Sequence, residues 1–147
     1  MDDILRYENR DQLYQYLIKD FGFVIQEERY SPESFGNFFI ELASNDFLLR
    51  YINDRDFLTI EIASHSDRLK WTDLSFVKNY INHAVDLNPG GQTISAKQRI
   101  DELNNFLKNN YELISDLFDR DNYKDTREKI DTLLLQSFDK RFPGMRQ

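Results

Sequence analysis

The clearest pattern in this sequence lies at residues 38–62, which read FFIELASNDFLLRYINDRDFLTIEI. Three candidate strands in it, Phe38–Ala43, Phe47–Ile52 and Phe57–Ile62, are rich in aromatic and aliphatic residues and alternate between two faces. Short segments rich in Asn and Asp separate them, and these residues tolerate the positive φ angles of tight hairpin turns. The segment therefore predicts consecutive antiparallel strands.

The turns set the expected register of these strands. A two-residue loop at Asn45-Asp46 places Glu41 opposite Arg50. A turn centred on Asp54-Arg55 then places Arg50 opposite Thr59. Because side chains alternate with a period of two, a slip of one residue in either hairpin would mix the two faces.

This register separates the strand residues into an apolar face and a mixed face. Leu49 is expected on the apolar face, between Leu42 and Ile60. The whole apolar face consists of Phe38, Ile40, Leu42, Phe47, Leu49, Tyr51, Leu58, Ile60 and Ile62. The mixed face consists of Phe39, Glu41, Ala43, Leu48, Arg50, Ile52, Phe57, Thr59 and Glu61. We expect the apolar face to carry the core.

Outside this segment the pattern changes to helical spacing. With a first strand at 23–30, the expected fold is α+β: a four-stranded antiparallel meander over about residues 23–63, with one N-terminal and three C-terminal helices packed on its apolar face. The chain from 65 to 68 reads as a polar link. The expected helices are Asp11–Phe21 before a Gly22 stop, Leu74–Ala84 after an Asp73 cap, a long helix from a Ser95–Gln98 capping box to Phe118, and Tyr123–Arg141.

Length and composition bound the class of protein. The chain has 147 residues, of which 40 % are hydrophobic and 21 are aromatic, enough for one domain over residues 1–147 with a single core. It has no cysteine, which excludes disulfides and thiolate metal sites. The sequence has neither a long apolar stretch nor a basic, then apolar, N-terminal leader, so we expect a cytoplasmic protein.

The charge is unevenly distributed. Of the net charge of −7, residues 1–70 carry −6 (14 acidic and 8 basic residues), and residues 71–147 carry −1 (12 acidic and 11 basic). An acidic surface repels nucleic-acid phosphates and anionic membranes, so neither is an expected partner. A basic protein partner is favoured, although a modest negative charge also serves solubility alone.

Motifs for metal binding and catalysis are missing from the sequence. His65 and His83 are too far apart for a helical zinc site. Residues 119–123 begin like a calcium loop, but Lys124 stands where glycine is needed and Ile130 where glutamate is needed, which favours a helix-breaking turn. No nucleophile elbow or phosphate loop occurs. We expect no cofactor, no metal and no catalytic residue of these types.

The mixed face is the candidate site. Charges flanked by aromatic residues are typical of protein-binding surfaces, so the candidate partner-binding residues are Phe39, Glu41, Arg50, Phe57, Thr59 and Glu61. Two alternatives remain open at this point. The face can be solvated or covered by a helix, with an ordinary cross-strand ion pair, or Glu41 and Glu61 can form an acid/base pair. Trp71 is expected to be a core anchor before the second helix.

A resemblance points to one function class. The segments Ser31–Phe38, Phe47–Tyr51 and Trp71–Leu74, in a small acidic α+β chain, resemble bacterial immunity-type proteins of polymorphic toxin systems. The resemblance implies binding to a cognate toxin, often a basic nuclease, and occlusion of its active site. It assigns no functional residue. Three hypotheses follow: a protein-binding module, a small enzyme using Glu41 and Glu61, and a homo-oligomeric structural subunit.

Overall fold

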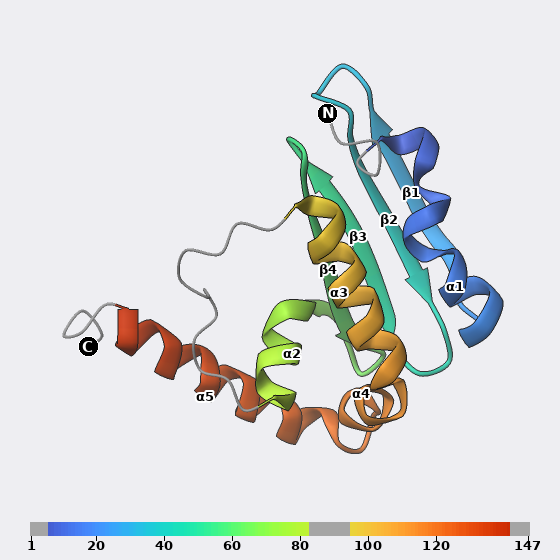
Figure 1. The fold of residues 1–147 in the computed structure, drawn as a ribbon. Helices are drawn as coiled ribbons and strands as arrows, with labels where there is room; N and C mark the ends of the chain where they lie inside the picture. The colour runs from blue at the N-terminus through green and yellow to red at the C-terminus, as the bar shows by residue number, and fades with distance from the viewer. Residues whose placement is uncertain (1–5, 83–94, 142–147) are drawn as a thin grey trace.

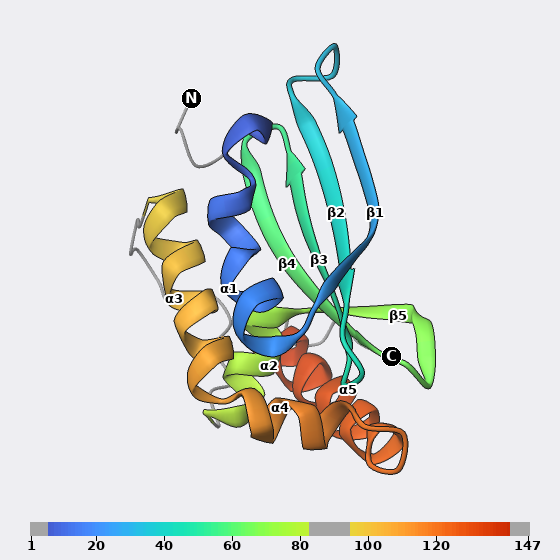
Figure 2. The ribbon, with the colours of Figure 1, turned by 90° about the vertical axis from the view of Figure 1, so that its right-hand side faces the viewer.

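The computed structural model describes residues 6–82 and 95–141, with side chains up to residue 136. The fold is α+β, as the alternation predicted, with a layer of helices on one side of an antiparallel sheet (Figures 1 and 2). A short 3-10 helix at Tyr7–Asn9 comes first. The described strands are β1 (Val24–Ser31), β2 (Asn37–Ala43), β3 (Leu48–Asp54), β4 (Phe57–Ser64) and β5 (Asp67–Asp73). The described helices are α1 (Asp11–Phe21), α2 (Leu74–Ile81), α3 (Ala96–Asn109), α4 (Tyr111–Phe118) and α5 (Tyr123–Arg141).

The sheet is a five-stranded meander, in the order β1-β2-β3-β4-β5 with every pair antiparallel. The expectation of four strands was wrong, because a fifth strand, β5, begins within the 65–68 stretch that reads as a polar link and continues to the Asp73 cap of α2. The first four residues of β5 are exposed. It pairs through its backbone with the last residues of β4, an interaction that needs no apolar alternation. Trp71 accordingly lies half-buried in an edge strand and is not part of the core cluster.

The first hairpin has the predicted register and the second does not. Glu41 pairs with Arg50, as the Asn45-Asp46 loop predicted. In the second hairpin Arg50 pairs with Glu61 instead of Thr59. The loop consists of Arg55 and Asp56, one position later than expected, and both residues have positive φ angles of 53° and 67°.

A register shift of two residues leaves every side chain on its predicted face. Leu49 lies between Leu42 and Ile62, where Ile60 had been expected, and all of these residues are completely buried. All nine residues predicted for the apolar face are at most 3 % exposed. The inference about the two faces is therefore confirmed, although the exact pairing of β3 with β4 was wrong.

Most predicted helix ends are confirmed. Gly22 ends α1 in the left-handed conformation, with φ 73°. Ser95 and Gln98 form the capping box that begins α3. Asp73 caps α2 by accepting a hydrogen bond from the Ser75 backbone N–H. The expected end of α2 at Ala84 lies outside the described residues.

The long helix expected from Ser95 to Phe118 is instead two helices, α3 and α4, which meet at Asn110. Tyr111, the next residue, stacks on Phe21 with a distance of 4.2 Å between ring centroids. Its hydroxyl donates to Asp46 Oδ2 over 2.9 Å, at the tip of the first hairpin. Burial raises the pKa of Tyr111 to about 12. These contacts between parts of the chain that are distant in the sequence accompany the break.

A buried polar network joins the helix layer to the sheet. Asn104 of α3 accepts hydrogen bonds on Oδ1 from the hydroxyls of Tyr16 and Tyr51, each 2.9 Å long. Its Nδ2 donates to the Leu13 carbonyl over 3.1 Å. Burial raises the pKa of Tyr51 well above its ordinary value, and that of Tyr16 as well. The network fixes α1, α3 and β3 relative to one another.

Candidate functional site: the open face of the sheet

The helix layer covers the apolar face of the sheet and leaves most of the mixed face uncovered. In Figure 2, α1, α2, α3 and α4 lie on one side of the strands, and no described helix lies over most of the opposite side. We call this opposite side the open face. Glu41, Arg50, Thr59 and Glu61 are all partly exposed there. Of the alternatives left open by the sequence, cover by a helix therefore does not apply to these residues.

A row of four charged residues crosses the open face. Glu27, Glu41, Arg50 and Glu61 are consecutive register partners on β1, β2, β3 and β4. Arg50 Nη2 donates to Glu61 Oε1 over 2.7 Å. Glu27 is paired with Arg29, at 2.5 Å. Among the described residues, the Glu41 carboxylate has no hydrogen bond or ion pair. The centre of the row therefore holds an uncompensated negative charge.

Two aromatic rings hold Arg50 in place. Its guanidinium carbon lies 3.9 Å from the centroid of the Trp71 ring and 5.5 Å from that of Phe39. Cation–π contacts of this kind, together with the ion pair to Glu61, restrict the rotamers of a long side chain. Arg50 is thus a preorganised part of the surface.

Most of the predicted site residues lie together. Phe39 and Thr59 face each other across Ile52 in the next row of the sheet, beside Glu41, Arg50 and Glu61. Phe57 stands apart at the beginning of β4, where the residue is 58 % exposed. There its centroid lies 4.1 Å from the guanidinium of Arg99, a residue of α3.

Sequence reasoning missed two residues of this surface. Trp71 comes from β5 and could be placed beside Arg50 only by recognising that strand. Glu27 comes from β1, whose register a bulge between residues 25 and 27 displaces.

The arrangement offers little for acid/base chemistry. Glu61 is bound to Arg50, which leaves Glu41 as the one of the two carboxylates without a bonded partner in the part of the chain that the structure describes. A surface hollow of about 840 Å³ lies elsewhere, around the α3–α4 junction, and is lined by residues such as Lys108 and Glu112. Within residues 6–82 and 95–141, no group of three or more His, Cys, Asp or Glu side chains could hold a metal ion.

The other motifs weighed from the sequence have ordinary structural contacts. His65 Nε2 bonds the Ser44 carbonyl oxygen at 2.7 Å, whereas His83 lies outside the described residues. Asp119 Oδ1 accepts hydrogen bonds from the backbone N–H groups of Asp121 and Asn122. The segment after α4 is therefore the helix-breaking turn that the sequence predicted.

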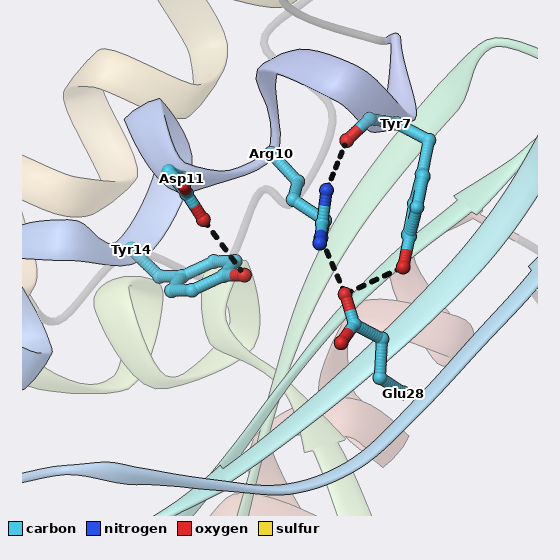
Figure 3. Close-up of polar contacts among 5 residues, drawn as sticks. All are labelled: Tyr7, Arg10, Asp11, Tyr14 and Glu28. Carbon is cyan, nitrogen blue, oxygen red and sulfur yellow. Dashed lines mark hydrogen bonds and ion pairs between the residues drawn. The ribbon is translucent and has the colours of Figure 1, made fainter.

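A second polar cluster lies on the helix side, around Glu28 of β1 (Figure 3). The Tyr7 hydroxyl donates to Glu28 Oε1 over 2.7 Å, and Arg10 Nε forms an ion pair with the same oxygen. The hydrogen bond from Tyr7 and the contact with Arg10 lower the pKa of Glu28 despite partial burial. Tyr7 also stacks on Tyr30, with 4.1 Å between centroids. The cluster holds the segment before α1 against the edge of the sheet.

Neither a membrane-spanning helix nor a known relative was found for the described chain. No described helix is long and apolar enough to cross a membrane. Comparisons with protein-family models, with curated proteins and with solved structures found no match to this chain.

Proposed function

We propose that the protein is a non-catalytic binding module whose open face docks a protein partner with a basic surface. The observation that carries this proposal is Glu41, a carboxylate without a partner among the described residues, set beside the ordered Arg50–Glu61 pair. Aromatic anchors next to charges that select the partner are typical of interfaces. The net charge of −7 favours attraction of a basic partner.

The proposed mechanism is occlusion by steric and electrostatic means. The resemblance to toxin-immunity proteins supports a partner whose own active site is covered on docking, and the proposed setting is the cytoplasm. Trp71 and Phe39 supply apolar contact area on the open face. The unpaired Glu41 supplies the charge that a lysine or arginine of the partner would meet.

The test begins with recovery of the partner by pull-down from the organism that makes the protein. Association rates are then measured at low and high salt for the wild type, Glu41→Lys and Arg50→Glu. We expect Glu41→Lys to slow association at low salt about tenfold, because it places a like charge against the partner. High salt should reduce the difference in association rate between the wild type and Glu41→Lys, because salt screens exposed charges.

Asp20→Lys is the matched control. Asp20 is exposed at the end of α1, in the helix layer, so the substitution changes the net charge equally and leaves the open face intact. An effect of Asp20→Lys as large as that of Glu41→Lys would reduce the proposal to general charge attraction. Association indifferent to salt and to all three substitutions would contradict it.

A further inference from the structure

The connection between β1 and β2 projects beyond the rest of the sheet (Figure 2). It consists of two successive turns. The Ser34 N–H donates to the Ser31 carbonyl, and the Asn37 N–H donates to the Ser34 carbonyl, each over 3.0 Å. The central residues of the second turn, Phe35 and Gly36, have φ angles of 59° and 70°. Positive φ at both positions is the pattern of a type I′ hairpin turn.

Phe35 is an unfavourable residue for this position. Type I′ turns favour Asn, Asp or Gly at the first central position, because a bulky side chain is strained at positive φ. Phe35 is also 70 % exposed. Among the described residues, its one ring contact is with the Arg55 guanidinium, 5.8 Å from the centroid. The fold therefore gains little from a phenylalanine here.

The other hairpin at this end of the sheet supports the same turn. Arg55 and Asp56 also have positive φ, but the Arg55 N–H donates to Asn37 Oδ1 over 2.7 Å. Asn37 Nδ2 in turn donates to Asp54 Oδ1 over 3.3 Å. Asn37 thus ties the two tips together. Phe35 is presented from a braced loop, which lowers the entropy lost on binding.

We infer that Phe35 is an anchor that inserts into an apolar pocket of the protein partner. Strain and exposure at one bulky residue point to a role outside folding. The acids around the tip, Glu33, Asp54 and Asp56, outnumber Arg55, so the pocket that receives the ring has a basic rim. The inference rests on the proposed function for the existence of a protein partner, but it concerns a different surface.

The first test measures thermal unfolding. Phe35→Asn creates Asn-Gly, the pair that type I′ turns favour most. We expect its Tm to rise by about 2–4 °C, as strain is relieved in a chain of this size. Phe35→Ala is the control, since it removes the ring and keeps a strained residue, and its Tm should stay unchanged. A lower Tm for both variants would show that the ring supports the fold, and would overturn the inference.

The second test uses photo-crosslinking in the organism that makes the protein. A benzophenone-bearing phenylalanine analogue replaces Phe35 or, as the matched control, Ile18, an exposed apolar residue of α1 in the helix layer, where no adduct is expected. We expect a discrete protein adduct from position 35. Excess wild-type protein should suppress it at least tenfold better than excess Phe35→Asn. Absence of the adduct, equal suppression by the two proteins, or an adduct with lipid would overturn the inference.

A third competitor separates this inference from the proposed function. Glu41→Lys alters the open face and leaves the tip unchanged. If excess Glu41→Lys suppresses the adduct as well as the wild type does, the tip binds a partner and the open face is not the docking site. If both Glu41→Lys and Phe35→Asn fail to suppress it, both surfaces contact the same partner.

Discussion

Leu49 and Arg50 are neighbours in β3, and they show how differently the two faces of the sheet are held. Leu49 is completely buried beneath the helix layer, in contact with a continuous core. Arg50 is held at the open face by Glu61 and by the Trp71 ring. The covered face is stabilised by burial, whereas the open face is ordered by a few directed contacts. Stability and recognition are therefore assigned to opposite faces of one set of strands.

The largest expected effect is on the covered face. Leu49→Ala removes a completely buried side chain and leaves a cavity, so it should lower the free energy of unfolding by about 2–5 kcal/mol. Leu69→Ala is the matched substitution at an exposed position of β5, where the residue is 94 % exposed, and should change the free energy of unfolding by less than about 0.5 kcal/mol. Urea unfolding of both variants measures the contrast. Similar losses would mean that buried and exposed positions of the sheet do not differ in this way.

The next largest effect is expected at the polar network between the helix layer and the covered face of the sheet. Asn104→Leu leaves the hydroxyls of Tyr16 and Tyr51 without their acceptor. We expect a loss of about 1–3 kcal/mol, the cost of buried polar groups without a partner. Tyr16→Phe should restore part of the loss in the double variant, because it removes one unsatisfied hydroxyl. Urea unfolding of the two single variants and of the double variant checks this. If the losses of unfolding free energy in the single variants simply add up in the double variant, the two residues do not belong to one network.

A smaller effect is expected at the Glu28 cluster, where the free energy of unfolding should depend on pH. The folded-state pKa of Glu28 lies below its unfolded value. The contribution of Glu28 to the free energy of unfolding is therefore complete above the unfolded pKa of about 4.3. It is lost as the pH falls through the lower, folded-state pKa. Glu28→Gln should cost about 1 kcal/mol at pH 7 and progressively less in acid. Unfolding curves at pH 7 and pH 3 measure the difference, and a cost independent of pH would contradict the assignment.

The smallest effect is expected on the open face. Glu61→Gln weakens the ion pair with Arg50, whose two side chains are about one-quarter exposed. Partly solvated pairs of this kind contribute about 0–1 kcal/mol, so stability should change little. Chemical denaturation of the wild type and of Glu61→Gln at low and high salt measures this change in the free energy of unfolding. A loss of several kcal/mol would show that the open face contributes to the fold as strongly as the covered face does.

The sequence predicted the candidate site in part. Glu41 and Arg50 were placed opposite each other because the Asn45-Asp46 loop and the alternation agree on one register. The same reasoning could not place Trp71 beside Arg50. That contact depends on β5, an edge strand whose exposed residues carry no hydrophobic alternation. The partner-binding role of these residues remains a prediction.

The second hairpin and the α3–α4 break are two features that local sequence alone does not predict. Asp54-Arg55 and Arg55-Asp56 are both reasonable turns, and the structure uses the second, in which the Arg55 N–H donates to Asn37 of the other hairpin. Helical periodicity likewise continues through Asn110, whereas the stacking of Tyr111 on Phe21 accompanies the break. In each case, partners distant in the sequence complete the local geometry.

By itself, the sequence determined the fold class, the membership of the two faces and most of the helix ends. These depend on period and on capping chemistry, which act over a few residues. Tertiary structure alone decided the fifth strand, the two-residue shift of β4 and the setting of Arg50 between Phe39 and Trp71. The physical reason is that alternation specifies which face a side chain occupies. Which residue lies next to it along that face depends on turns and contacts that close only when the chain has folded.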